Sequence, residues 1–136
     1  MLFVTLPVFA DSHIKEIMES NCEELGAGRG AECVQLQRKL IREKAYIDQN
    51  GASICSLIWQ WASRSGNTDI AAGMVLSCLK QIVNLQISDE TQETCNRTVY
   101  MDQGSITPMQ TIQLKVKKMM DCIKKLGVPV TNGPSR

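Results

Sequence analysis

The stretch TDIAAGMVLSCLKQIVNLQI, residues 68–87, decides the fold class of this 136-residue chain. Its apolar residues recur at spacings of three and four, which is the pattern of an amphipathic helix. Asn67 or Thr68 can cap the N-terminus of that helix, and Gly73 in its middle would let a neighbouring helix approach closely. Lys80 is one of several polar residues that keep the apolar run shorter than the roughly 18 residues of a membrane span. We therefore predict a core helix over residues 68–87.

The same pattern predicts helices along most of the remaining chain, over residues 11–25, 31–49, 54–64, 88–102 and 107–127. Only 4% of the residues are aromatic, and β-branched residues do not gather in alternating runs, so strands are not expected. The prediction is a single all-α domain over residues 11–127, folded as a disulfide-stapled bundle of five to six helices.

Turn and capping residues set the predicted boundaries of these helices. The glycine-rich residues 26–30 end the first helix, and Gly51, with the asparagine before it, ends the second. Ser53 is the expected N-cap of the third helix. Pro108 opens the last helix within a capping box. The apolar seam of that helix is predicted to consist of Ile112, Val116, Met119, Ile123 and Leu126.

The two ends of the chain differ in composition from the helical domain. Residues 1–10, MLFVTLPVFA, are apolar and place Val8 and Ala10 at positions −3 and −1 of a secretory cleavage site. We interpret them as the remnant of a signal peptide, and the alternative is a buried N-terminal strand or helical turn. Residues 128–136 have turn composition and are predicted to form a loose tail.

Six cysteines, an even number, favour disulfides and an oxidising compartment, with free buried thiols as the alternative. The gaps between successive cysteines are 10, 21, 22, 16 and 26 residues, and CxxC pairs are absent from the sequence, which excludes zinc ribbons and thioredoxin-like redox motifs. Cysteines at equal distances from a turn lie at the same height in a helical hairpin. The two symmetric pairs and the remaining pair give the predicted bonds Cys22–Cys33, Cys55–Cys78 and Cys95–Cys122.

Catalytic and metal-binding patterns are weak in this sequence. Its single histidine, His13, lies close to the presumed mature N-terminus. A histidine that acts as the base for a nucleophile must be held rigidly, and the first turn of a helix holds it poorly. Carboxylate pairs are available in the first helix, but a solvated acidic face explains them as well; they are Glu16, Glu19, Glu23 and Glu24. We predict no enzymatic activity, no metal site and no cofactor.

Charge is distributed unevenly along the chain. Residues 107–136 carry six basic groups and one acidic group, a balance of +5, whereas the whole chain has a net charge of only +1. The lysines of the last helix are therefore candidates for docking to an acidic protein surface or to anionic lipid headgroups, and solubility is the alternative role. These lysines are Lys115, Lys117, Lys118, Lys124 and Lys125.

Two tryptophans are further candidates for contact with a partner. Trp59 and Trp61 are two positions apart on a helix, so both are not expected to be buried on one face. The second is either wedged beneath a neighbouring helix or exposed as an anchor for another protein.

Taken together, these patterns predict a secreted or periplasmic protein that binds another protein, as an inhibitor, immunity factor or adaptor. Nucleic acid is not an expected partner, because the net charge is low and aromatic residues are not interleaved with basic ones. The first alternative is a carrier of a small apolar ligand or lipid in the bundle interior, suggested by the methionines. The second alternative is an enzyme with a carboxylate pair.

Overall fold

The computed structural model describes residues 10–64, 66–101 and 108–130, which form five helices and two short strands. In chain order these elements are α1 (Ala10–Arg42), α2 (Gln49–Ser63), α3 (Thr68–Gln81), β1 (Leu85–Gln86), α4 (Asp89–Met101), α5 (Pro108–Leu126) and β2 (Val128–Pro129). The predicted all-α, disulfide-stapled bundle is confirmed. The predicted signal remnant falls on residues 1–10, of which residues 1–9 lie outside the described residues.

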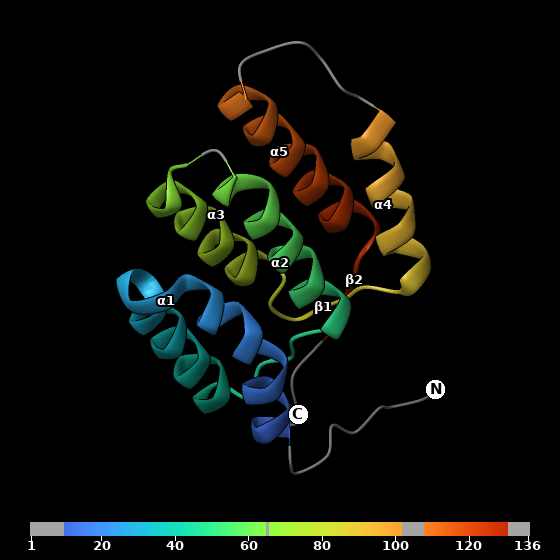
Figure 1. The fold of residues 1–136 in the computed structure, drawn as a ribbon. Helices are drawn as coiled ribbons and strands as arrows, with labels where there is room; N and C mark the ends of the chain where they lie inside the picture. Colours follow the sequence, from blue (N-terminus) through green and yellow to red (C-terminus); the bar gives the residue numbers. More distant parts are fainter. Residues whose placement is uncertain (1–9, 65, 102–107, 131–136) are drawn as a thin grey trace.

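The fold is a stack of three helical hairpins (Figure 1). The first hairpin is α1, whose two arms lie side by side; the second pairs α2 with α3, and the third pairs α4 with α5. The α2–α3 hairpin is the middle layer, because α1 contacts both of its helices on one side and α5 contacts both on the other. The central stretch of the sequence therefore lies at the centre of the molecule.

The first hairpin turns at one residue. Gly26 has φ 63° and ψ −155°, a conformation that suits glycine and interrupts the helix between its two arms. Gly28 and Gly30 belong to the second arm, so the turn predicted over residues 26–30 is shorter than expected.

The second arm of α1 ends at Arg42 rather than near residue 49, which corrects the predicted boundary. Lys44 adopts φ 55° and its N–H donates to Ile41 O at 3.1 Å, while Ala45 N–H donates to Leu40 O at 2.9 Å. These two bonds form a Schellman motif, which glycine usually terminates. Because a lysine takes that left-handed position here, no glycine marks the end of the helix in the sequence.

Helix α2 begins earlier than predicted, since its N-cap is Asp48 and not Ser53. The Asp48 side chain accepts a hydrogen bond from Asn50 N–H at 2.9 Å. Gly51 was predicted to end a helix but lies in the first turn of α2, where it is buried. A methyl group at Gly51 would lie 2.8 Å from Ile82 Cδ1, so glycine allows α2 and the segment after α3 to touch.

Helix α3 ends at Gln81, six residues before the predicted end. The chain leaves the helix because Asn84 adopts φ 59° and forms bonds with the α1–α2 connection. Asn84 N–H donates to Tyr46 O at 2.7 Å, and Asn84 Oδ1 accepts from Tyr46 N–H at 2.8 Å. These tertiary bonds replace the helical bonds that the apolar periodicity predicted.

In the last hairpin, α4 and α5 agree with the helices predicted over residues 88–102 and 107–127, and α5 begins at Pro108 as expected. Residue 107, the predicted capping residue, lies outside the described part of the chain. After α5, Val128 and Pro129 pair with Gln86 and Leu85 as an antiparallel two-stranded ribbon. This part of the chain therefore differs from the loose tail expected from residue 128 onward, and residues 131–136 are not described.

One hydrophobic core runs through all three layers. Each hairpin contains its own disulfide, and the bonds are those predicted: Cys22–Cys33, Cys55–Cys78 and Cys95–Cys122. Their Cα–Cα distances are 5.3, 5.6 and 5.7 Å, within the usual range. The disulfides therefore close each hairpin, while apolar packing and hydrogen bonds hold the hairpins together. Disulfides of this kind form in an oxidising compartment.

Candidate functional site

The outer face of α5 carries the lysines that the sequence singled out. Lys117, Lys124 and Lys125 are exposed, whereas Lys115 and Lys118 are partly buried. Lys117 Nζ lies 3.1 Å from Asp121 Oδ2, an exposed ion pair one turn apart. The structure thus brings three of the five predicted lysines to the surface along one helix.

An exposed leucine lies among these lysines. Leu114 is 46% exposed, although it has the size of a core residue. Lys117 and Lys118 follow it at three and four positions, so they are its neighbours on the helix surface. Beyond the end of the helix, Val128 is 57% exposed. Sequence periodicity did not identify either residue, because it locates only the side of a helix that faces the core.

Leu126 was predicted to belong to the buried seam of α5 but is 41% exposed. It is the last residue of the helix. The middle of the predicted seam is confirmed, since Met119 and Ile123 are fully buried, whereas Ile112 and Val116 are partly buried.

Neither tryptophan stands out from the surface. Trp59 and Trp61 are both partly buried and packed against the core. The Lys115 ammonium lies 5.2 Å from the centre of the Trp61 ring, within the range of a cation–π contact. The structure therefore joins two of the predicted residues, and both tryptophans pack against the core.

A groove lies between α3 and α5 and has a volume of about 280 Å³. Its apolar lining consists of Met74 from α3 and of Val116 and Met120 from α5. Its polar lining consists of Gln81, Gln113, Lys117 and Asp121. The sequence could not reveal this groove, because α3 and α5 are far apart along the chain and become neighbours only in the fold.

The interior methionines belong to the packed core. Met18 and Met119 are fully buried, and Met120 is only 4% exposed. These side chains are among those that suggested a ligand in the bundle interior. Their burial in the core explains their presence by packing.

A polar cluster joins the first arm of α1 to α2. The Asn21 side-chain amide donates to Ala52 O and to Ser56 Oγ, both at 3.1 Å, and Ser56 Oγ lies 3.3 Å from Glu24 Oε1. Burial raises the pKa of the Glu24 carboxyl group, and the hydrogen bond from Ser56 partly offsets that effect. The other three carboxylates that the sequence analysis considered, Glu16, Glu19 and Glu23, are exposed. The cluster supplies hydrogen-bond acceptors for the buried Asn21 amide and joins the α1 hairpin to α2.

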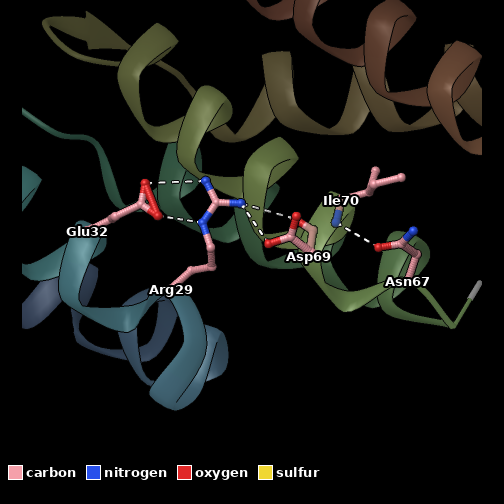
Figure 2. Close-up of polar contacts among 5 residues, drawn as sticks. All are labelled: Arg29, Glu32, Asn67, Asp69 and Ile70. Carbon is pink, nitrogen blue, oxygen red and sulfur yellow. Dashed lines mark hydrogen bonds and ion pairs between the residues drawn. The ribbon is translucent and has the colours of Figure 1, made fainter.

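Arg29 forms a second polar contact, at the turn of the α1 hairpin (Figure 2). Its guanidinium donates to the Glu32 carboxylate at 2.5 and 3.3 Å and to Asp69 Oδ1 at 3.2 Å. The hydrogen bond with Glu32 is the largest effect that raises the pKa of Arg29, and it lowers the pKa of Glu32. Arg29 thereby links the α1 hairpin to the first turn of α3, where Asn67 caps the helix by accepting from Ile70 N–H (Figure 2).

Within the described residues, no group of three or more His, Cys, Asp or Glu side chains is arranged to hold a metal ion. His13 is exposed on α1. A search of the same residues for a helix long and apolar enough to cross a membrane found none. Of the features described above, the α5 face and the adjoining groove combine exposed apolar side chains with charge.

Comparisons of this chain with protein-family models, with curated proteins and with solved structures found no significant match.

Proposed function

We propose that this protein binds another protein through the outer face of α5, in a secreted or periplasmic setting. The surface that we assign to this role consists of Leu114, Lys117, Lys124 and Lys125, and we call it the α5 surface. The observation that carries the proposal is an exposed leucine on a helix rich in lysines. Apolar side chains surrounded by charge are typical of a contact patch, and the surrounding charge sets the sign of the partner.

The electrostatics favour an acidic partner. Helix α5 contains five lysines and one acidic residue, Asp121, which gives a balance of +4 over its 19 residues. The whole chain, in contrast, has a net charge of +1. Charge concentrated on one element guides the association of oppositely charged surfaces.

The scaffold supports such a role because it holds α5 from both sides. The Cys95–Cys122 bond joins α5 to α4, and the β1–β2 ribbon ties the residues after α5 to the segment after α3. A surface held in one conformation loses little entropy on binding. The three disulfides support the proposed exported setting, because they form in an oxidising compartment, and an inhibitor, an immunity factor or an adaptor would each use a surface of this kind.

The experiment is a charge reversal with a matched control. The test variant is Lys117→Glu/Lys124→Glu/Lys125→Glu, and the control variant is Arg38→Glu/Lys39→Glu/Arg42→Glu on α1, where the three residues are also exposed. Both variants change the net charge by the same amount, and both alter basic residues in the last turn of a helix. Circular dichroism establishes that each variant is folded before binding is measured.

Each protein is then used to capture partners from the extracellular or periplasmic fraction of its source, with quantification by mass spectrometry. The proposal expects one acidic protein, near equimolar, with the wild type and the α1 control and at least about tenfold less with the α5 variant. Equal recovery by the α5 variant, or recovery of no stoichiometric protein by the wild type, would refute it.

A further inference from the structure

The groove between α3 and α5 adjoins the α5 surface and shares Lys117 with it. Met120 forms its floor, being only 4% exposed, while Met74 and Val116 are partly buried and form its walls. Ile70, one turn before Met74 on the same face of α3, is 39% exposed and extends the apolar stripe. The result is a line of apolar side chains between two helices that is open to solvent.

The openness of the groove argues against a small-molecule ligand. Pockets for such ligands have volumes of about 300–1,000 Å³ and enclose most of the ligand surface. This groove, at about 280 Å³, lies near the lower end of that range and is open to solvent, so it would enclose little of a ligand's surface but can accept a few side chains. A groove between two helices is the usual receptor for the apolar side of a third helix, whose anchors lie at positions i and i+4.

Methionine is well suited to line such a receptor. Its unbranched thioether side chain adapts to different shapes and is frequent on surfaces that accept helical segments. Two of the three apolar lining residues, Met74 and Met120, are methionines on opposite helices. A side chain inserted into the groove would therefore contact one methionine from α3 and one from α5.

The charges around the groove indicate the chemistry of the inserted helix. Lys117 borders the groove, and Lys124 follows two turns later on the same face of α5. The single acidic residue in the lining, Asp121, is paired with Lys117. A helix with glutamate or aspartate beside its apolar anchors complements this arrangement, whereas a basic helix is repelled.

We propose that the α3–α5 groove receives an acidic amphipathic helix of the partner protein, with two apolar side chains four residues apart contacting Met74, Val116 and Met120. This inference rests on the proposed function and deepens it, because it names the structural class of the partner segment. It extends the binding surface from α5 to α3.

Synthetic helices test the groove without knowledge of the natural partner. The probe is a stapled helical peptide of about 15 residues with two leucines at i and i+4 and glutamates on both flanks. One control peptide replaces the leucines by alanine, and the other replaces the glutamates by lysine. Binding is followed in the full chain carrying ¹³C-methyl methionine, whose methyl signals separate Met74 and Met120 from the fully buried Met18 and Met119.

The proposal expects the acidic leucine peptide to shift the Met74 and Met120 signals and to bind at least about tenfold more tightly than either control peptide. Met74→Glu should weaken binding by at least about tenfold, while Thr68→Glu, the same charge change at an exposed position on α3, should leave it unchanged. Should Met74→Glu fail to fold, Lys117→Glu serves instead, since Lys117 is exposed; it should reverse the preference between the acidic and basic peptides.

Three results would overturn the inference: no peptide binding up to about 1 mM, equal binding of the alanine peptide, or shifts of the same signals by a single-chain anionic lipid but not by the peptide. Capture of the natural partner distinguishes failure of this inference from failure of the proposed function. If Met74→Glu captures the partner as well as the wild type does, but the α5 charge reversal does not, the groove is excluded as a binding site and the α5 surface is still supported.

Discussion

The Asp48 side chain accepts a hydrogen bond from the backbone N–H of Ile87, 39 residues later, at 3.2 Å. The same oxygen accepts from the Tyr46 hydroxyl group at 2.7 Å, and the other carboxylate oxygen caps α2 through Asn50 N–H. One carboxylate thus joins the start of α2 to the segment that follows β1. This contact places the middle hairpin relative to the last one.

Replacement of Asp48 by alanine should be strongly destabilising. It removes the N-cap of α2, which is worth about 0.5–2 kcal/mol, and leaves the buried Ile87 N–H without a partner, at a cost of about 1–3 kcal/mol. We expect a decrease of about 2–4 kcal/mol in the free energy of unfolding, measured by urea denaturation with the disulfides intact. Asp121→Ala, at an exposed position, is the control and should change stability by less than about 0.5 kcal/mol. Similar losses in the two variants would contradict the role given to Asp48.

Tyr46 should make the protein less stable in alkali. Burial, and after it the hydrogen bond and charge of Asp48, raise the pKa of the Tyr46 hydroxyl group well above its usual value. The native state therefore holds this proton after the unfolded chain has lost it, near pH 10, and stability falls as the pH rises beyond that point. The slope is at most about 1.4 kcal/mol per pH unit, and partial exposure of Tyr46 reduces it.

The pH dependence is measured as the free energy of unfolding between about pH 8 and pH 11.5. Tyr46→Phe lacks the ionisable group and should show a flatter curve above pH 10, although its stability at neutral pH is lower by the lost hydrogen bond. Parallel curves for the two proteins would show that Tyr46 does not titrate differently in the native and unfolded states.

Replacement of two helical glycines by alanine should change the stability of the protein in opposite directions. At Gly51 a new methyl group would lie 2.8 Å from Ile82 Cδ1 and 3.1 Å from Ile87 Cδ1, so overpacking should outweigh the helix propensity of alanine. At Gly73 the nearest atom is Arg29 Nη1 at 3.8 Å, an ordinary contact. We expect Gly51→Ala to lower the melting temperature, with a loss of about 1–2 kcal/mol, and Gly73→Ala to raise it, with a gain of about 0.5–1 kcal/mol.

The three disulfides should contribute according to the loops that they close. For separations of 11 and 27 residues, chain entropy gives about 2.8 kcal/mol for Cys22–Cys33 and about 3.5 kcal/mol for Cys95–Cys122. Double alanine variants of each pair, compared by urea denaturation, should therefore keep this order. The wild type should show no reactive thiol before reduction and six after it in denaturant, because every cysteine is paired. Thiols that react in the native protein would contradict the pairing.

Much of the fold could be predicted because its signals are local. The spacing of Ile70, Met74 and Val75 identifies α3, and Pro108 marks the start of α5. Two of the disulfide pairs followed from a geometric rule, since cysteines equidistant from a turn meet in a hairpin, and the third pair followed by elimination. The boundaries failed where the terminating residue was unusual, as at Lys44, or where a distant group replaced the helical hydrogen bonds, as Tyr46 does for Asn84.

The candidate site was predicted only in part. The lysines of α5 follow from charge, which is a property of single residues, but their exposure depends on neighbours, and Lys115 proved to lie against Trp61. The groove has no counterpart in the sequence, because Met74 and Met120 are 46 positions apart and belong to different hairpins.

The sequence by itself determined the helical class, the hairpin disulfides and the excess of positive charge in α5, since each depends on residue type and on spacing within one hairpin. The tertiary structure alone decided the ends of α1 and α3, the exposure of Leu114 and Leu126, and the groove between α3 and α5. The physical reason is that each disulfide lies within one hairpin and none joins two of them, so their mutual positions depend on side-chain packing and on a few long-range hydrogen bonds.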